Sequence, residues 1–219
     1  MQKGTKIILA VLFFLIVMSG TIAVLSYILI NKSLPQYNGK IDFPALSTPA
    51  EIQWNEFAVP HIQAKDDADL FRLLGYVHAQ ERLWQMDFFR RAGAGELSEI
   101  FGAEALSTDK LMRTWGLKSI AQTALDSLSN ESRTVLTAYS EGVNHFMKTN
   151  TARLPIEFSL LGYKPRPWEP IDTITIQKVV AMRLSQAWHV ELTFYQLAQK
   201  FGLRAAMDLF PDYPAATGG

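Results

Sequence analysis

The chain has 219 residues and no formal net charge, because 21 lysines and arginines balance 21 aspartates and glutamates. This balance argues against nucleic acid as the main partner, since a phosphate-binding surface needs a basic excess. The sequence contains no cysteine, which excludes disulfide frameworks, cysteine-based metal sites and cysteine nucleophiles.

Residues 7–30 form an uncharged and almost entirely apolar stretch. About 20 such residues in a helix cross the hydrocarbon core of a bilayer. Lys3 and Lys6 precede the stretch, which favours a cytoplasmic N-terminus. No small-x-small cleavage site follows it, so an uncleaved signal anchor is favoured over a cleaved signal peptide or a buried core helix. We therefore expect a cytoplasmic segment 1–6, a transmembrane segment 7–30 and single-pass localisation in the cell membrane, with the main part extracytoplasmic.

A linker and two short strands are predicted after this stretch. Residues 31–50 are rich in proline and small polar residues and predict a linker with one short strand at 40–43. The segments 51–55 and 58–64 are separated by a short turn, which is typical of a β-hairpin. Pro60 lies within the second segment and places it at a sheet edge.

From Asp66 onward the pattern is mainly helical. Apolar residues at helical spacing, with capping residues before them, predict helices over residues 66–92, 104–128, 130 to at least 146, and 172–202. The segment 154–170 contains four prolines and is interpreted as an ordered loop. The predicted fold class is mainly α with a short N-terminal β-hairpin, preceded by a transmembrane helix.

Glu81 is an unusual residue in the first predicted globular helix. At about 100° per residue it lies within the apolar stripe of that helix. An unpaired acid there would cost several kcal/mol or keep its proton. We therefore expect a structural ion pair, which is favoured over a catalytic carboxylate, with one of four candidate partners: Arg82, Arg90, Arg91 and Arg113.

Several sequence blocks, in a fixed order, resemble the penicillin acylase family. The resemblance extends over about residues 40–214. The blocks are Val59-Pro60-His61-Ile62, GYVHAQERLWQMD from Gly75 to Asp87, Arg90-Arg91, Gly95-Glu96-Leu97-Ser98-Glu99, Leu161-Gly162-Tyr163, and Leu184-Ser185 followed by Trp188 and Glu191-Leu192.

The resemblance implies an N-terminal-nucleophile (Ntn) amidohydrolase, made as a precursor that cleaves itself into α and β chains. Such enzymes hydrolyse the side-chain amide of N-acylated compounds: penicillins, cephalosporins or acyl-homoserine lactones. Their nucleophile is the first serine of the β chain, activated by its own α-amino group. Residues 51–219 match the α-subunit region of the αββα Ntn-hydrolase fold, and no serine follows Ser185. We therefore expect a chain truncated before the β subunit, with no catalytic residue of its own and no activity alone.

The family's α-chain roles carry over to three positions. The resemblance assigns Arg183 and Leu184 to the substrate-binding pocket and Glu191 to a structural calcium ion. Arg183, Ala187 and Glu191 share one face of the helix predicted over 172–202. One glutamate supplies one or two of the 6–8 oxygens that calcium takes, so the β subunit is expected to complete the site.

The expected partners are thus a β subunit from the same precursor or a separate gene, a small-molecule N-acyl substrate, and the membrane. Two alternatives belong to other classes: a non-catalytic fragment of an interrupted gene, and a binding module without amidase activity. A downstream reading frame that begins with serine and encodes a long β-rich chain would distinguish the enzyme from both.

Overall fold

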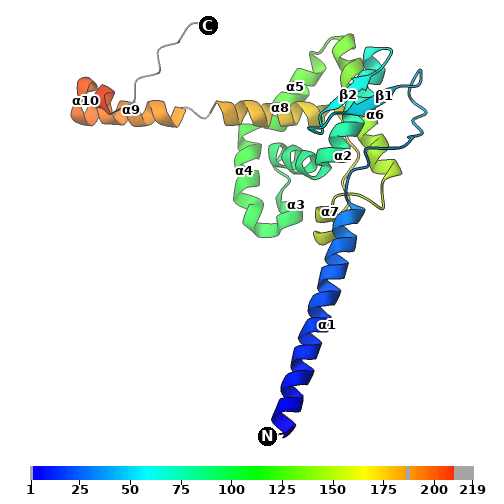
Figure 1. The fold of residues 1–219 in the computed structure, drawn as a ribbon. Coiled ribbons are helices and arrows are strands. Elements are labelled where there is room, and N and C mark those ends of the chain that lie inside the picture. The colour runs from blue at the N-terminus through cyan, green and yellow to red at the C-terminus, as the bar shows by residue number, and fades with distance from the viewer. Residues whose placement is uncertain (1, 186–187, 210–219) are drawn as a thin grey trace. The chain divides into compact units, whose positions relative to one another are not determined.

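Helices make up most of the chain in the computed structural model, which describes residues 2–185 and 188–209 (Figure 1). Contacts divide the chain into two units, Met1–Ile176 and Gln177–Gly219. The elements are, in chain order, α1 (Gln2–Lys32), β1 (Glu51–Trp54), β2 (Pro60–Gln63), α2 (Asp67–Ala94), α3 (Ser98–Phe101), the 3-10 helix η1 (Gly102–Ala105), α4 (Leu106–Trp115), α5 (Leu117–Asp126), α6 (Asn130–Thr149), α7 (Ile156–Leu160), α8 (Pro170–Leu184), α9 (Trp188–Phe201) and α10 (Leu203–Asp208).

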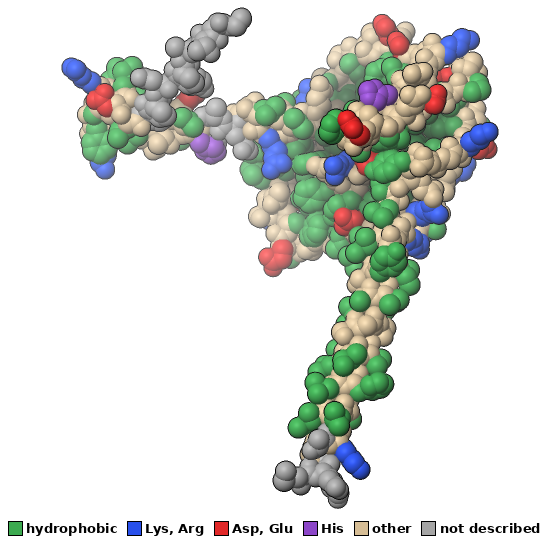
Figure 2. Space-filling model, in the orientation of Figure 1, with side chains coloured by type: hydrophobic (Ala, Val, Ile, Leu, Met, Phe, Trp, Pro, Cys, Tyr) green, Lys and Arg blue, Asp and Glu red, His purple; other side chains and the backbone are tan. Residues whose placement is uncertain are grey.

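The predicted transmembrane segment lies inside α1. By length and composition, Lys6–Lys32 is a helix able to cross a membrane, and none of its apolar window is buried against the rest of the protein. Hydrophobic side chains cover it along its length (Figure 2). A signal sequence passes the same test, so membrane insertion itself stays a prediction.

The predicted hairpin is confirmed. β1 and β2 pair antiparallel, with Ile52 opposite Ile62 and Trp54 opposite Pro60. Asn55 holds the turn because its side-chain oxygen accepts from the backbone N–H of Val59 at 2.9 Å. The short strand predicted at 40–43 is wrong: these residues are irregular.

Within the first unit, helices α2 and α6 pack against each other. Asp66 caps α2 by accepting from the N–H of Asp69 at 2.9 Å, as its residue type predicts. Two glycines allow the helices to approach closely. A Cβ on Gly75 would lie 2.1 Å from the carbonyl oxygen of Tyr139, and one on Gly142 would lie 1.9 Å from that of Arg72.

The core of the first unit forms around this helix pair. It includes residues of α2, α6 and the segments that cross them: Phe43, Leu73, Tyr76, Ala79, Leu83, Met86, Val143, Phe146, Phe158 and Trp168. The segments that carry Phe43 and Trp168 are irregular, so the loops contribute to the core as well as the helices.

Three of the predicted element boundaries are wrong. The helix expected over 104–128 is split at Gly116, whose φ of 70° ends α4 in the left-handed region. The helix expected over 172–202 ends at Leu184, and the hydroxyl and backbone N–H of Ser185 both donate to the carbonyl of Ala181 in its last turn. The loop expected over 154–170 contains the short helix α7.

The second unit contains the end of α8 together with α9 and α10. α9 and α10 pack against each other across Gly202, which adopts a φ of 85°. Ala206 is fully buried within this unit.

Candidate functional site

The three positions singled out by the family resemblance lie in the second unit. Arg183 and Leu184 are the last residues of α8, and Glu191 lies in the first turn of α9. Leu184 is 81% exposed, and Arg183 and Glu191 are exposed as well. The shared face predicted for Arg183, Ala187 and Glu191 stays a prediction: Arg183 and Glu191 lie on the separately described helices α8 and α9. Ala187 lies outside the described residues.

Glu191 fits a calcium ion as one ligand and no more. Its carboxylate is a hard oxygen donor of the kind calcium prefers. Within residues 2–185 and 188–209, no group of three or more acidic or histidine side chains could hold a metal ion. A complete calcium site would therefore need ligands from outside the described part of the chain.

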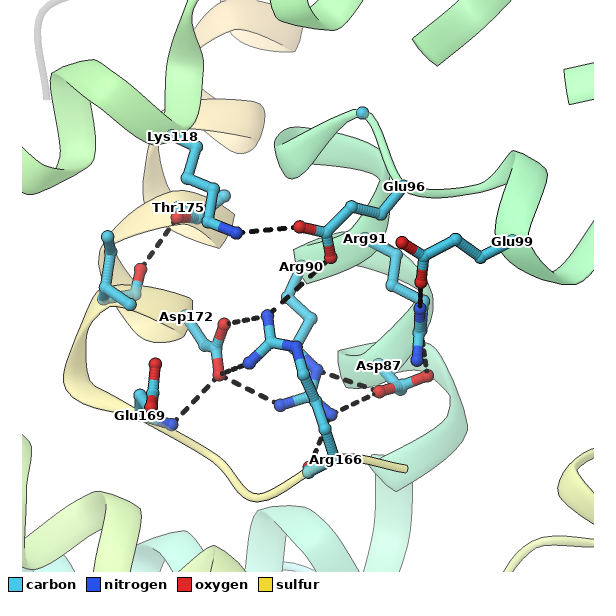
Figure 3. Close-up of polar contacts among 12 residues, drawn as sticks. Asp87, Arg90, Arg91, Glu96, Glu99, Lys118, Arg166, Glu169, Asp172 and Thr175 are labelled. Carbon is cyan, nitrogen blue, oxygen red and sulfur yellow. Dashed lines mark hydrogen bonds and ion pairs between the residues drawn. The ribbon is translucent and has the colours of Figure 1, made fainter. Parts of the chain in front are cut away.

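A cluster of charged side chains is buried in the first unit, and the sequence alone assigned it no role. Its centre is Asp87 of α2, whose carboxylate is fully buried (Figure 3). Asp87 accepts from the guanidinium groups of Arg90 at 2.8 Å and Arg91 at 3.0 Å, and from the Tyr163 hydroxyl at 2.8 Å. The i, i+3 and i, i+4 spacing places both arginines beside this carboxylate on one helix.

Arg90 connects α2 to the segment that leads into α8. Its side chain is fully buried, and it donates to Asp172 at 2.9 Å. It also donates to the carbonyl oxygens of Arg166 and Pro167, at 2.7 and 3.1 Å. The guanidinium lies 4.8 Å from the centre of the Trp168 ring, within range of a cation–π interaction.

Asp172 fixes the beginning of α8. Its carboxylate accepts hydrogen bonds from the two terminal guanidinium nitrogens of Arg166, at 2.7 and 2.9 Å. It also accepts one from the backbone N–H of Glu169 at 3.0 Å. A bidentate arginine–carboxylate pair is both strong and geometrically specific. The Asn144 amide adds two hydrogen bonds to the backbone of Trp168, which attach the same segment to α6.

The charges at the edge of this cluster are also paired. Arg91 donates to Glu99 at 2.8 Å, and Lys118 donates to Glu96 at 2.7 Å. Burial works against the charged form of Arg91, but Asp87 and Glu99 outweigh it and raise the pKa of Arg91. Burial and the hydrogen bond to Asp87 raise the pKa of Tyr163.

The cluster is therefore equipped to hold structure and not to perform chemistry. Asp87 and Asp172 each accept hydrogen bonds from two arginine side chains, so both carboxylates are already occupied by contacts within the fold. The sequence signal that could have revealed the cluster is the combination of Asp87, Arg90 and Arg91 at helical spacing.

The expected ion pair of Glu81 is wrong. Among the described residues, no salt bridge involves Glu81; its carboxylate accepts from the Tyr37 hydroxyl at 3.4 Å and from Gln80 at 3.3 Å. Glu81 is half-buried, so water can still reach it and the cost that predicted an arginine partner does not apply. The acid of α2 that forms ion pairs with Arg90 and Arg91 is Asp87.

Comparisons with known proteins agree with the resemblance seen in the sequence. The family model described as penicillin amidase matches residues 49–218. A penicillin acylase 2 proenzyme from Pseudomonas sp. (strain SE83) is 38% identical over 159 residues, which are 73% of this chain and 20% of that protein. An acyl-homoserine lactone acylase, QuiP, from Pseudomonas syringae pv. tomato is 33% identical over 81% of this chain and 22% of its own length.

A solved structure also shares the fold. A thermostable penicillin G acylase from Alcaligenes faecalis superposes with a TM-score of 0.59 at 24% sequence identity, over 78% of this chain and 96% of that one. The family model spans well over half of the sequence, so the chain belongs to the penicillin amidase family. It matches the α-subunit region of that family and spans about a fifth of the length of the two relatives above.

Proposed function

We propose that this chain is the α-subunit part of a penicillin acylase-type amidohydrolase, which cleaves the side-chain amide of penicillins, cephalosporins or acyl-homoserine lactones. The family match over residues 49–218 is the observation that carries this proposal. The relatives include both penicillin acylases and acyl-homoserine lactone acylases, so the shared chemistry is hydrolysis of an N-acyl amide.

The proposed division of labour gives the nucleophile to a β subunit. Its N-terminal serine would attack the amide carbonyl, its α-amino group would take the serine proton, and backbone or amide donors of the same chain would stabilise the oxyanion. This chain would supply Arg183 and Leu184 to the wall of the acyl pocket. The exposed leucine side chain is suited to contact an apolar acyl group once a partner covers it.

Glu191 is proposed as the α-chain ligand of a calcium ion shared with the β subunit. The support is its position after the Leu184-Ser185 block and its exposed carboxylate, since a ligand to a shared ion must face the partner. Calcium in this role would join the subunits and would not touch the scissile bond.

Residues 7–30 are proposed to stay in the membrane as an anchor, with Lys32 onward outside the cytoplasm. Mass analysis of the expressed protein tests this directly. An intact N-terminus in the membrane fraction is expected, and a mature N-terminus between residues 20 and 40 would contradict it.

The function itself is tested by co-expression with the β chain encoded in the same genome. The pair should hydrolyse chromogenic phenylacetyl amides or acyl-homoserine lactones. Glu191→Ala should reduce the yield of assembled enzyme more than the turnover number of the molecules that do assemble. Glu99→Ala is a matched control, because it also removes an exposed carboxylate but lies in the first unit. A matched pair that assembles and leaves every amide of both classes intact would refute the proposed function.

A further inference from the structure

A hollow of about 380 Å³ lies beside the C-terminal end of α1. Its polar lining includes Lys32, Ser33, Ser159 and Lys164, and its apolar lining includes Leu154 and Phe158. The Ser33 hydroxyl donates to the carbonyl oxygen of Leu154 at 3.2 Å, which ties the end of α1 to one wall. The hollow thus combines two cationic side chains, several hydroxyl groups and apolar side chains.

The charged side chains that line this hollow are all cationic. None of the described residues that line it is acidic. Lys32 and Lys164 are exposed, and neither forms a salt bridge with another residue in the described part of the chain. Elsewhere in the first unit the carboxylates of Asp87 and Asp172 bind arginines tightly, so an uncompensated pair of lysines in a concave site points to an anionic ligand.

Exposed apolar side chains adjoin the hollow. Leu160 and Leu161 lie between two of its lining residues, Ser159 and Gly162, and are 73% and 39% exposed. Leu34, two residues beyond Lys32, is 52% exposed. Lysines with leucines beside them match a bilayer surface, where anionic headgroups lie above acyl chains.

The position of Lys32 in the sequence indicates the level at which the hollow would lie relative to the bilayer. It follows Ile30, the last residue of the apolar stretch, by two residues, which is about 3 Å of helix rise. The headgroup layer is roughly 5–8 Å deep on each side of the hydrocarbon core. If α1 spans the bilayer, Lys32 lies in this layer whatever the tilt of the helix, and so does the hollow it lines.

We propose that this hollow binds the phosphate of an anionic phospholipid headgroup, with Leu160 and Leu161 inserted among the outer acyl chains. Lys32 and Lys164 would neutralise the phosphate, and the hydroxyl of Ser159 would donate a hydrogen bond to it. The inference rests on the proposed membrane anchor. It adds that the first unit is seated on the membrane and not merely tethered to it.

The test uses the full chain in nanodiscs that contain equal amounts of phosphatidylglycerol and phosphatidylcholine. Because the sequence has no cysteine, Ile16→Cys and Leu160→Cys each carry a single environment-sensitive fluorophore. Both labels should be quenched by lipids with a nitroxide group. Native mass spectrometry of the released unlabelled chain should find phosphatidylglycerol retained in preference to phosphatidylcholine.

The lysines are tested by a matched pair of variants. Each lysine near the surface contributes about fivefold in affinity for anionic lipid, so Lys32→Ala with Lys164→Ala should lower the phosphatidylglycerol preference about 25-fold. Lys65→Ala with Lys110→Ala removes the same charge from exposed sites outside the hollow and should leave the preference unchanged.

Four outcomes would overturn the inference. Quenching at residue 16 without quenching at residue 160 would leave the anchor intact and refute the seated surface. Absence of quenching at both would refute the anchor and the inference with it. An equal preference for phosphatidylglycerol in the Lys32/Lys164 double variant and the Lys65/Lys110 double variant would refute the headgroup site. Saturation of the site by sn-glycerol 3-phosphate, with no added gain from lipid, would assign the hollow to a soluble phosphate compound.

Discussion

Asp87 organises the polar interior of the first unit at the scale of single residues. Its carboxylate is fully buried and accepts hydrogen bonds from the side chains of two arginines and a tyrosine. Burying an ion pair costs desolvation energy, so such pairs add little net stability. Removing one member, however, leaves the remaining charges buried with fewer partners.

Asp87→Ala should therefore lower the free energy of unfolding by about 3–5 kcal/mol, because Arg90 and Arg91 lose their shared anion. Glu99→Ala is the control, since Glu99 also pairs with Arg91 but its side chain is 60% exposed, and it should cost about 0–1 kcal/mol. Urea denaturation of the full chain in detergent, followed by tryptophan fluorescence, measures both. Equal costs for the two variants would contradict the structural role of the cluster.

His145 makes the stability of the first unit depend on pH. Its ring stacks on Phe43 with 4.0 Å between centroids, and its Nε2 is the buried side-chain atom without a hydrogen-bond partner in the described chain. Burial lowers the pKa of His145, Asp42 partly opposes this through a backbone hydrogen bond and its charge, and Lys148 adds a smaller lowering effect. The unfolded state therefore binds more protons, so stability is complete above about pH 6.5 and falls as the pH drops below this value.

The unfolding midpoint should thus be lower at about pH 5.5 than at about pH 7.5, and His145→Phe should reduce this difference. His61→Gln, which replaces an exposed histidine on β2, should leave the difference as it is. Thermal unfolding followed by circular dichroism at the two pH values gives the comparison. A pH dependence that survives in His145→Phe and disappears in His61→Gln would assign the effect to the wrong residue.

The contrast between Glu81 and Asp87 shows what helical periodicity can find at this scale. Periodicity marks Glu81 as an acid on an apolar stripe, but the structure leaves it half-buried, with a tyrosine and a glutamine as partners. Asp87 becomes buried only because residues 163–172, about 80 positions later, fold over it and bring Asp172 and Tyr163 to the arginines. No local pattern contains that information.

At the scale of elements, the close contact between α2 and α6 determines the shape of the first unit's core. Gly75 and Gly142 let each helix rest on the backbone of the other. Close packing of this kind tolerates no added methyl group unless the backbones separate.

Gly75→Ala should cost at least about 3 kcal/mol, the upper part of the usual range for overpacking, because the new methyl group would overlap a backbone carbonyl and not a movable side chain. Gly20→Ala is the matched control: it is also a glycine within a helix, but a Cβ there would have no atom within 4 Å. The same urea denaturation measures both. A Gly75→Ala variant as stable as the unchanged chain would show that the helices do not pack as closely as described.

The main helices and the hairpin were predictable from the sequence, whereas the short helix α7 and the ends of several elements were not. Asp66 and Ser129 cap α2 and α6, and the hairpin follows the two short apolar segments that predict it. The breaks at Gly116 and Ser185 were missed for different reasons. Glycine within a helix is often tolerated, and a serine hydroxyl that donates to the carbonyl four residues earlier, as Ser185 does to Ala181, also occurs within helices.

The end of α8 at Leu184 affects the predicted geometry of the proposed site. One continuous helix would have placed Arg183 and Glu191 on a common face, but α8 and α9 are separate helices. The roles proposed for Arg183, Leu184 and Glu191 therefore rest on the family resemblance and on their exposure, and each can be tested separately.

At the scale of the whole molecule, the described chain has the family's fold and exposed residues at the family's α-chain positions. It also has a buried charge cluster with every carboxylate occupied by arginines. This combination is compatible with the proposed α-subunit role. The fold could be predicted because the family's sequence blocks occur in order, whereas nothing in the sequence defines the acyl group that the proposed enzyme would cleave.

The central proposal is that this chain contributes to an amidase and does not hydrolyse amides alone. The most direct measurement compares hydrolysis of a chromogenic phenylacetyl amide and of an acyl-homoserine lactone by the purified full chain, by the β chain from the same genome, and by the two co-expressed. We expect turnover of at least one substrate by the pair and none by either chain separately. Hydrolysis by this chain alone, retained after Arg183→Ala and Leu184→Ala, would contradict the account.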